Sequence, residues 1–311
     1  DLDTDADNEW TIIDFNLEVT PINDTPTLTP PQDFIWSESG LGQGWATAPQ
    51  MVTAPDAQLD DQFGTSHAVD GQWAVVGAPH ANTNGTSSGA AYVYQMQGEA
   101  WVYHSKLTAS DVAALDEFGD AVALDGNTIF VGAPNGDIEG TIDIGAVYVF
   151  QFNGTSWIES SKLSSNIQTE GQHFGSVIKA TDGFLAVGVS ETTTRPGSVL
   201  IFGNDSQGWR HEETIVSPAL DDGYGESLDI SGNTLIVGAP RDDNPKGTNA
   251  GAAYFYTFDS EDWSLNEKIL PSQSSPNLYF GGDVAISGDR AVIGQTGVFT
   301  GENPETGDWG A

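Results

Sequence analysis

The sequence predicts an all-β protein made of tandem copies of one unit of four short strands. An aromatic residue followed by glycine returns five times, at Phe63, Phe118, Phe174, Tyr224 and Phe280. A second glycine lies fourteen residues after each of the five aromatic residues, so the spacing within the motif is constant. The aromatic residues are 50 to 56 positions apart, a period typical of repeat architectures, and no helical period is sustained anywhere.

Each unit is expected to contain four strands in a fixed order, which the first repeat shows well. The first strand (66–69) follows the Phe-Gly pair, and a tight turn at Asp70 and Gly71 leads to an apolar second strand (73–76). The third strand begins at Gly89, and the fourth begins twelve residues later at Trp101. Asp-Gly and Ser-Gly pairs supply the positive φ that two-residue hairpins need, and such a pair occupies this turn in all five repeats.

Four antiparallel strands in a unit of this length form one blade of a β-propeller. Inner strands crowd around the axis of a propeller, where glycine allows backbones to approach closely. The repeated Phe and Trp rings are expected to fill the space between blades, because large rings bury the most apolar area per residue.

The last of the five repeats is incomplete, since Gly310 and Ala311 look like the start of its third strand. Residues 34–53 are expected to form two outer strands of a blade and would then close a five-bladed ring. Alternatively, the natural chain continues into six or seven blades, which a sequence that stops inside a motif favours.

The first 33 residues differ from the repeats. Residues 1–26 contain one predicted strand (10–20) followed by a proline-rich turn, and residues 27–33 are a linker, so that the propeller occupies residues 34–311. Four aspartates have the spacing of EF-hand ligands, but Asn8 replaces the required glycine. A looser Ca²⁺ site is the prediction and a solvated acidic turn is the alternative; the four residues are Asp3, Asp5, Asp7 and Asp14.

The repeats resemble FG-GAP repeats, the blades of the integrin α-subunit propeller, in their bacterial secreted form. The resemblance rests on KLTASD at 106–111, DEFG at 116–119, VGAP at 131–134 and GAVYVF at 145–150, and it extends over residues 34–311. Integrin blades often carry an Asp-x-Asp-x-Asp-Gly calcium loop between the first two strands. A two-residue turn stands there in this chain, so no cofactor is expected in the blades.

The segment before the linker resembles the end of a cadherin-like β-sandwich domain. Asn23 and Asp24 match the Asn-Asp pair that helps to bind calcium between such domains, although Pro21 replaces the aspartate usually found two residues earlier. The resemblance therefore implies a second group of Ca²⁺ ligands near the linker.

The charge of the chain limits its partners. There are 45 acidic and 9 basic residues, which give a net charge of −36. Such a surface repels nucleic acids and anionic membranes, because binding either requires Lys or Arg to neutralise phosphates. No apolar run approaches the length of a membrane span, and the absence of cysteine excludes disulfides and thiol catalysis.

The loops between the second and third strands vary most and are expected to form a composite binding site on one face of the propeller. Their candidate residues are Asn82, Asn84, Asp137, Glu139, Asp143, Arg195, Arg241, Asp242, Asp243 and Asn244. The acidic run at 242–244 is the best local candidate for a ligand or Ca²⁺, with a solvated turn as the alternative. The acidic residues that precede the aromatic-glycine pairs, such as Asp61 and Asp116, are placed on the other face, where they would accept backbone N–H groups.

A catalytic role is not expected. The five histidines share no metal-ligand spacing, and no nucleophile motif such as Gly-x-Ser-x-Gly occurs. The sequence and the resemblance together predict an extracellular or cell-surface adhesion module of a large bacterial surface or secreted protein. Its partner would be a protein, a glycan or other copies of itself. The alternatives are a polysaccharide-active enzyme or accessory domain that uses the loop face, and a structural spacer.

Overall fold

The computed structural model describes residues 51–138, 141–166, 170–189, 196–273 and 275–296. All the regular structure of these residues is β, which confirms the predicted fold class. In the same residues, no helix has the length and apolarity to cross a membrane. Several predicted features lie outside the described residues: the N-terminal segment, the linker, all but the last three residues of the outer strands predicted at 34–53, and the site residues Asp3, Asp5, Asp7, Asp14, Asn23, Asp24, Glu139 and Arg195. Residues 51–53, the described end of those predicted strands, form no strand.

The strands group into four complete blades and a fifth of two strands, and each sheet is an antiparallel meander in chain order. Blade 1 contains β1 (His67–Asp70), β2 (Trp73–Ala78), β3 (Ala90–Gln97) and β4 (Ala100–Leu107). Blade 2 contains β5 (Val122–Asp125), β6 (Thr128–Ala133), β7 (Ala146–Phe152) and β8 (Trp157–Leu163). Blade 3 contains β9 (Val177–Thr181), β10 (Phe184–Val189), β11 (Ser198–Asp205) and β12 (Gly208–Val216). Blade 4 contains β13 (Ser227–Ser231), β14 (Thr234–Ala239), β15 (Ala252–Phe258) and β16 (Trp263–Ile269), and blade 5 contains β17 (Phe280–Ser287) and β18 (Arg290–Gln295).

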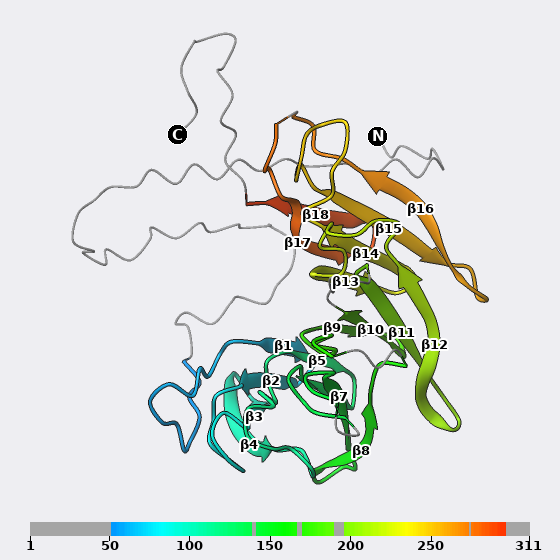
Figure 1. Cartoon of the computed structure of the whole chain (residues 1–311). Helices are drawn as coiled ribbons and strands as arrows, with labels where there is room; N and C mark the ends of the chain where they lie inside the picture. The colour runs from blue at the N-terminus through cyan, green and yellow to red at the C-terminus, as the bar shows by residue number, and fades with distance from the viewer. Residues whose placement is uncertain (1–50, 139–140, 167–169, 190–195, 274, 297–311) are drawn as a thin grey trace, which may run out of the picture.

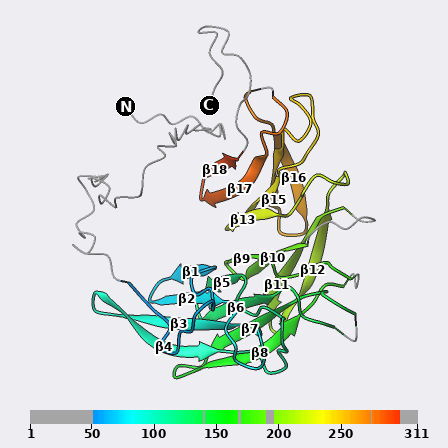
Figure 2. The same cartoon turned by 60° about the vertical axis from the view of Figure 1, so that its left-hand side comes forward.

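The blades follow one another around an arc (Figure 1). Their first strands lie innermost, so that β1, β5, β9, β13 and β17 are neighbours in that order. In both views β1 and β17 lie apart, and the described blades form an open arc (Figures 1 and 2).

The turn after each first strand is where it was predicted, but its residues have different roles. Asp70 pairs with Trp73, so the two loop residues are Gly71 and Gln72, and only the glycine has a positive φ (54°). Asp70 is thus the last strand residue, and its side chain reaches the next blade, where Oδ2 accepts the Gly126 N–H at 2.6 Å. The predicted pair with two positive φ values occurs only in blade 3, at Asp182 and Gly183.

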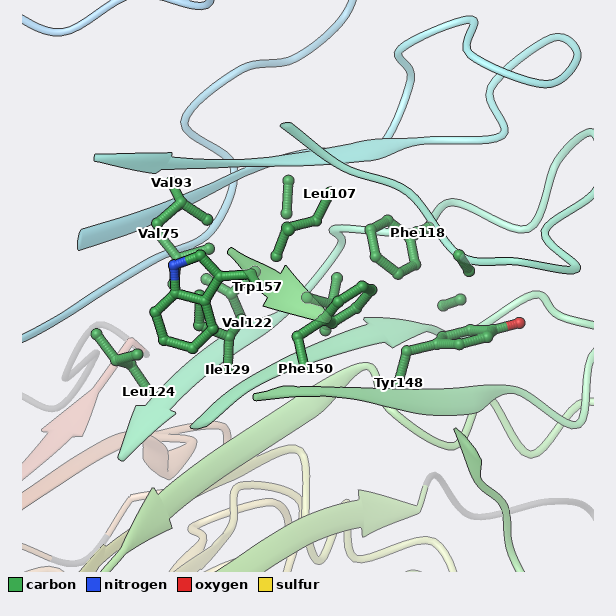
Figure 3. Close-up of a cluster of buried hydrophobic side chains, with 14 of the residues drawn as sticks. Val75, Val93, Leu107, Phe118, Val122, Leu124, Ile129, Tyr148, Phe150 and Trp157 are labelled. Atoms are coloured by element: carbon green, nitrogen blue, oxygen red, sulfur yellow. The ribbon is translucent and has the colours of Figure 1, made fainter. Parts of the chain in front are cut away.

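Aromatic and aliphatic side chains fill the space between blades, as predicted. Between blades 1 and 2, Trp73 of β2 packs edge-on against Trp157 of β8, with ring centroids 5.2 Å apart. Figure 3 shows Val75 and Val93 from blade 1 beside the ring of Trp157 from blade 2, and Leu107 from blade 1 above Phe150. Because β2 is buried along its whole length, it needs apolar residues on both faces, which explains its unbroken apolar run.

The repeated glycines meet each other across the contact between blades, which we call the junction. A methyl group added at Gly132, at the end of β6, would overlap the carbonyl oxygen of Gly175, which follows the aromatic residue of blade 3. The same overlap joins Gly77 to Gly119, Gly188 to Gly225 and Gly238 to Gly281. Each junction therefore requires a glycine from both motifs, because only glycine allows backbones to approach this closely.

Candidate functional site

Two kinds of loop share one face of the arc, which we call the loop face. The loop between the second and third strands of one blade pairs with the loop that leads to the next blade. Thr86 accepts a hydrogen bond from the backbone N–H of Leu115 at 2.9 Å, and Ser88 accepts one from Phe118 at 3.1 Å. The prediction that the acidic residues before the aromatic pair lie on the other face is therefore wrong. In a meander the chain reverses at every strand end, so every second connection returns to the same face.

The role predicted for these acidic residues is confirmed. Asp61 accepts the backbone N–H of Gln58 at 2.7 Å, and Asp116 accepts that of Ala113 at 2.8 Å. Both carboxyl groups are buried. Burial raises the pKa of Asp116, and the hydrogen bond from Ala113 only partly offsets this effect. These residues shape the backbone in front of each blade.

The predicted residues of the variable loops mainly hold the loops in shape. Asn84 Nδ2 donates to the carbonyl of Val112, in the loop that leads to blade 2, at 2.6 Å. Four others use a side-chain oxygen to accept a backbone N–H of their own loop: Asn82 from Ser87 at 2.9 Å, Asp137 from Asp143 at 3.1 Å, Asp243 from Asn249 at 2.7 Å and Asn244 from Lys246 at 2.9 Å. Asp143 thus takes part through its backbone N–H. Such side chains fix loop geometry by replacing backbone partners.

The acidic run at 242–244 contains a structural carboxylate. Asp242 is only 4 % exposed, and its carboxylate accepts hydrogen bonds from the Tyr254 hydroxyl at 3.0 Å and from Lys268 Nζ at 2.8 Å. Lys268 also lies over the Tyr254 ring, 5.1 Å from its centroid. Burial raises the pKa of Tyr254 above its usual range, so the hydroxyl stays a donor to Asp242. We call this arrangement the Tyr–Asp–Lys cluster.

The same cluster recurs in blades 1 and 2 with an aspartate from a different loop. Asp111 accepts hydrogen bonds from Tyr148 at 2.8 Å and Lys162 at 2.9 Å, and Asp56 does the same with Tyr92 and Lys106. Asp56 and Asp111 precede their blades, whereas Asp242 lies between β14 and β15 of its own blade. In each of these blades an aspartate from a loop is bound by a tyrosine and a lysine from the strands, so the cluster fixes the loop to the blade wherever the aspartate lies in the sequence.

Polar side chains of the loop face form pairs, two of them between consecutive blades and one within blade 4. His80 follows Gly-Ala-Pro in blade 1, and its Nε2 lies 3.7 Å from Glu117 Oε1, directly before Phe118. One blade further, His173 Nδ1 lies 2.9 Å from Asn135 Oδ1 in the equivalent positions. In blade 4, Arg241 pairs with Glu226 at 2.7 Å. We call these residues, together with Asp120, the inner rim.

Asp120 connects the two histidine pairs. Burial raises the pKa of its carboxyl group, Glu117 adds to the rise, and His80 and His173 oppose it. Three ionisable side chains, from its own blade and the two neighbouring blades, thus act on the Asp120 carboxyl group. In the part of the chain that the structure describes, no group of three or more His, Asp or Glu residues is arranged to hold a metal ion.

The backbone of the inner rim is held in an uncommon conformation. The residue before the aromatic has a positive φ in all five repeats: Gln62 (56°), Glu117 (57°), His173 (49°), Gly223 (69°) and Tyr279 (54°). Non-glycine residues in this region cost free energy and persist where the surrounding structure imposes them, often at functional sites. The sequence of a single repeat does not reveal the inner rim, because two of its pairs join different repeats. Aligning the repeats does reveal it. His80 and Asn135 both directly follow Gly-Ala-Pro, and Glu117 and His173 both directly precede the phenylalanine of the next repeat.

The paired glycines and the meander of each blade match a known repeat. The pattern of the FG-GAP repeat matches residues 47–94, 101–150, 212–256 and 263–307, more than half of the chain. The chain belongs to the FG-GAP repeat family. The FG-GAP matches leave out most of blade 3, where Val189 and Ser190 replace Ala-Pro, although β9 to β12 form a complete blade there.

Two solved structures are similar to parts of this chain. A protein from Lactobacillus plantarum is 14 % identical with a TM-score of 0.43, and the alignment covers 65 % of this chain and 53 % of that one. A functionally unknown protein from Desulfotomaculum acetoxidans is 10 % identical with a TM-score of 0.45, and the alignment covers 71 % and 59 %. The chain thus aligns with less than two thirds of either protein, and neither likeness bears on function. No curated protein matches the chain.

Proposed function

We propose that this FG-GAP segment is a binding module that recognises a protein or glycan through its inner rim. The observation that carries the proposal is the repeated side-chain pair at equivalent positions of two successive junctions, His80 with Glu117 and Asn135 with His173. Asp120 lies in the same region, where Glu117, His80 and His173 influence its carboxyl group. Most other polar residues of the loop face support their own loops or the Tyr–Asp–Lys clusters. The inner rim instead brings hydrogen-bond donors and acceptors together on a rigid scaffold, as binding sites on loops require.

The chemistry of the rim indicates the class of ligand. Imidazole, amide and carboxylate groups offer both donors and acceptors, which suits a ligand rich in hydroxyl or amide groups. The net charge of −36 disfavours acidic ligands, so a neutral or basic partner is expected. We further propose an extracellular or cell-surface location within a large bacterial surface protein, in line with the resemblance to secreted FG-GAP and cadherin-like proteins.

A screen of glycan and protein arrays with the 311-residue chain tests the proposal. Glu117→Gln and His173→Ala are expected to weaken binding of any ligand by at least about tenfold, the effect of losing one charged hydrogen bond. The matched control is Glu99→Gln, in the β3–β4 turn, which lies on the opposite face and should leave affinity unchanged. If no ligand is found, or if rim and control variants bind alike, the inner rim is not the site.

An enzymatic role is the rival function, and one observation favours it. Asp120 has a raised pKa and Glu117 contributes to the rise, and glycoside hydrolases use carboxyl groups whose environments set their pKa values apart. Turnover of a polysaccharide panel separates the two functions. We expect no turnover; product formation that Asp120→Asn abolishes while binding persists would favour the enzyme.

We also propose that calcium binds the N-terminal segment rather than the blades. The support is the spacing of Asp3, Asp5, Asp7 and Asp14, together with Asn23 and Asp24 before the linker. Calorimetric titration with Ca²⁺ should give a saturable signal in the full chain. A chain in which Asp3, Asp5 and Asp7 are replaced by Asn should lose that signal; if it is retained, the ligands lie elsewhere.

A further inference from the structure

The loop that leads to blade 2 contains an exposed leucine in an unfavourable backbone conformation. Leu115 lies between β4 and β5, has a φ of 73° and is 61 % exposed. A positive φ is rare for a bulky residue, because its Cβ crowds the backbone carbonyl. Such outliers persist where the surrounding structure imposes them, and they are concentrated at functional sites.

Pairing with the neighbouring loop of blade 1 holds Leu115 in this conformation. The backbone N–H of Leu115 donates to the carbonyl of Thr86 at 2.9 Å. Two residues further, the N–H of Glu117 donates to the carbonyl of Ser87 at 3.2 Å. The two loops are thus fastened to each other on both sides of Asp116, and the conformation of Leu115 follows from the junction.

The backbone does not explain why this residue is a leucine. The residue three positions before the aromatic has a positive φ in all five repeats. In the other four it is Asp60 (68°), Gly171 (72°), Asp221 (60°) and Asn277 (59°). Glycine, asparagine and aspartate adopt positive φ at little cost. Blade 2 alone among the five repeats places a leucine at this position.

Packing does not explain the leucine either. Leu115 is the last of three consecutive exposed apolar residues, Ala113, Ala114 and Leu115, which we call the apolar patch. Both loops of this junction, 79–89 and 108–118, lie entirely within the described residues. A run of exposed apolar residues is unfavourable in a folded chain unless function requires it.

The surroundings of the apolar patch are acidic. The two loops together contain three acidic residues and no Lys or Arg. Asp116 is buried, and Asp111 pairs with Lys162 of β8 at 2.9 Å. Glu117, whose side chain is 28 % exposed, is therefore the acidic group available beside the patch. An apolar surface next to a carboxylate is complementary to a partner that carries an apolar side chain beside a positive charge.

We propose that the apolar patch anchors a basic protein segment, with a large apolar side chain of that segment against Leu115 and an adjacent Lys or Arg on Glu117. The inference rests on the proposed function, since it requires the loop face to bind a partner, and it narrows that partner to a protein. Burial of Leu115 supplies affinity through apolar area, whereas an aliphatic side chain offers no hydrogen bond to the hydroxyl groups of a glycan.

Short synthetic peptides provide the probe. Their central residue is Trp, Leu or Ser, and the residues on either side are Lys, Ser or Glu. Binding to the full chain is measured by fluorescence anisotropy at about 0.15 M ionic strength, where non-specific attraction is screened. Trp or Leu between lysines should bind at least about tenfold more tightly than Ser between lysines, because only the former bury an apolar side chain. Equal binding of the Trp, Leu and Ser peptides overturns the proposal.

Variants of Leu115 separate a binding role from a structural one. Leu115→Asn should weaken binding of the Trp–Lys peptide about tenfold and raise the melting temperature by about 2 °C, because asparagine accepts the positive φ. Leu115→Met keeps an apolar side chain and should keep the affinity. If Leu115→Asn lowers the melting temperature, the leucine packs against its own chain and the proposal is overturned.

A matched control lies outside the loop face. Ile158 follows the β7–β8 turn, is 51 % exposed and does not have a positive φ. Ile158→Asn should leave the affinity for the Trp–Lys peptide unchanged and should not raise the melting temperature. If Ile158→Asn weakens peptide binding as much as Leu115→Asn does, the peptide is not bound at the apolar patch and the proposal fails.

A glycan array, run beside the peptides, distinguishes failure of this proposal from failure of the proposed function. A glycan that binds the wild type and Leu115→Asn equally, but not Glu117→Gln, would overturn the protein partner and keep the inner rim as the site. If neither peptides nor glycans bind, both proposals fall. Peptide binding that Leu115→Asn weakens and His173→Ala does not would support the apolar patch and remove the rest of the rim from the site.

Discussion

The junction glycines offer a sharp test of what holds the blades together. Gly132 does not have a positive φ, so alanine would fit its backbone conformation, and only the neighbouring blade opposes the added methyl group. That group would overlap the carbonyl oxygen of Gly175, which belongs to a backbone that cannot rotate away. Gly132→Ala is therefore expected to separate blades 2 and 3 slightly and to lower the free energy of unfolding.

The size of the effect follows from two opposing contributions. Overpacking a rigid site costs up to about 3 kcal/mol. Replacing glycine by alanine returns about 1 kcal/mol or less, because it restricts the unfolded chain. The net loss is about 2 kcal/mol, which corresponds to a fall of about 5 °C in the melting temperature for a domain of this size.

Gly294 supplies the matched control, because it holds the same motif position in blade 5 and none of the described residues of another blade lies against it. Its nearest contact for an added methyl group is an ordinary 3.4 Å, so Gly294→Ala should leave the melting temperature unchanged or slightly raise it. Both variants are compared with the wild type by circular dichroism at low concentration and low salt. Equal shifts for Gly132→Ala and Gly294→Ala would refute the argument that the glycines serve close approach between blades.

Four further outcomes are expected. Trp157→Ala should cost about 3 to 5 kcal/mol, because this buried ring packs against Trp73 of the preceding blade. Tyr148→Phe should cost about 1 kcal/mol, because Asp111 loses a hydrogen bond. Asp120→Asn should melt above the wild type at pH 7, and the advantage should disappear on acidification. The raised pKa of Asp120 means that the wild type loses stability as pH rises above the ordinary aspartate value. Added NaCl should raise the melting temperature of the wild type, since it screens the net charge of −36.

Thermal melts of matched variants test these expectations, and three outcomes would contradict them. Tyr103→Phe removes an exposed hydroxyl and should be silent, so a loss equal to that of Tyr148→Phe would mean that the bond to Asp111 contributes nothing. If the melting temperature of Asp120→Asn stays above that of the wild type at low pH, the difference does not come from ionisation of the Asp120 carboxyl group. A melting temperature that falls with added salt would show that attractive ion pairs outweigh the repulsion between carboxylates.

The repeated fold could be predicted from the sequence because each junction between blades requires the same residues at the same spacing. The fourteen residues from Phe118 to Gly132 span one inner hairpin, with Gly119 at its start and Gly132 at its end. In every blade this hairpin has to bring its two glycines close to the backbones of the neighbouring blades. Apolar runs on both faces of β2 and β6 predicted strands covered on two sides, and both strands are buried. Local patterns therefore decided the architecture.

The site was harder to predict because its residues meet across repeats. The sequence predicts the wrong face for the acidic residues before each Phe-Gly pair, because their spacing along the chain does not show which strand ends lie on the same face. Asp242 looked like part of an exposed acidic run, yet its partners Tyr254 and Lys268 come from two later strands. His80 and Glu117 are far apart in the sequence and become neighbours only through the junction.

Blade 3 has no Tyr–Asp–Lys cluster, since Leu200 and Thr214 occupy the sequence positions of Tyr148 and Lys162, and Ile167 that of Asp111. In a linear array of blades, stability is the sum of each blade and its contacts with its neighbours. The array is then expected to open first in its middle, with the fastest amide exchange in β11 and β12 and two cooperative halves on either side. One missing polar cluster would thus divide a single arc into two units that yield separately under load or denaturant.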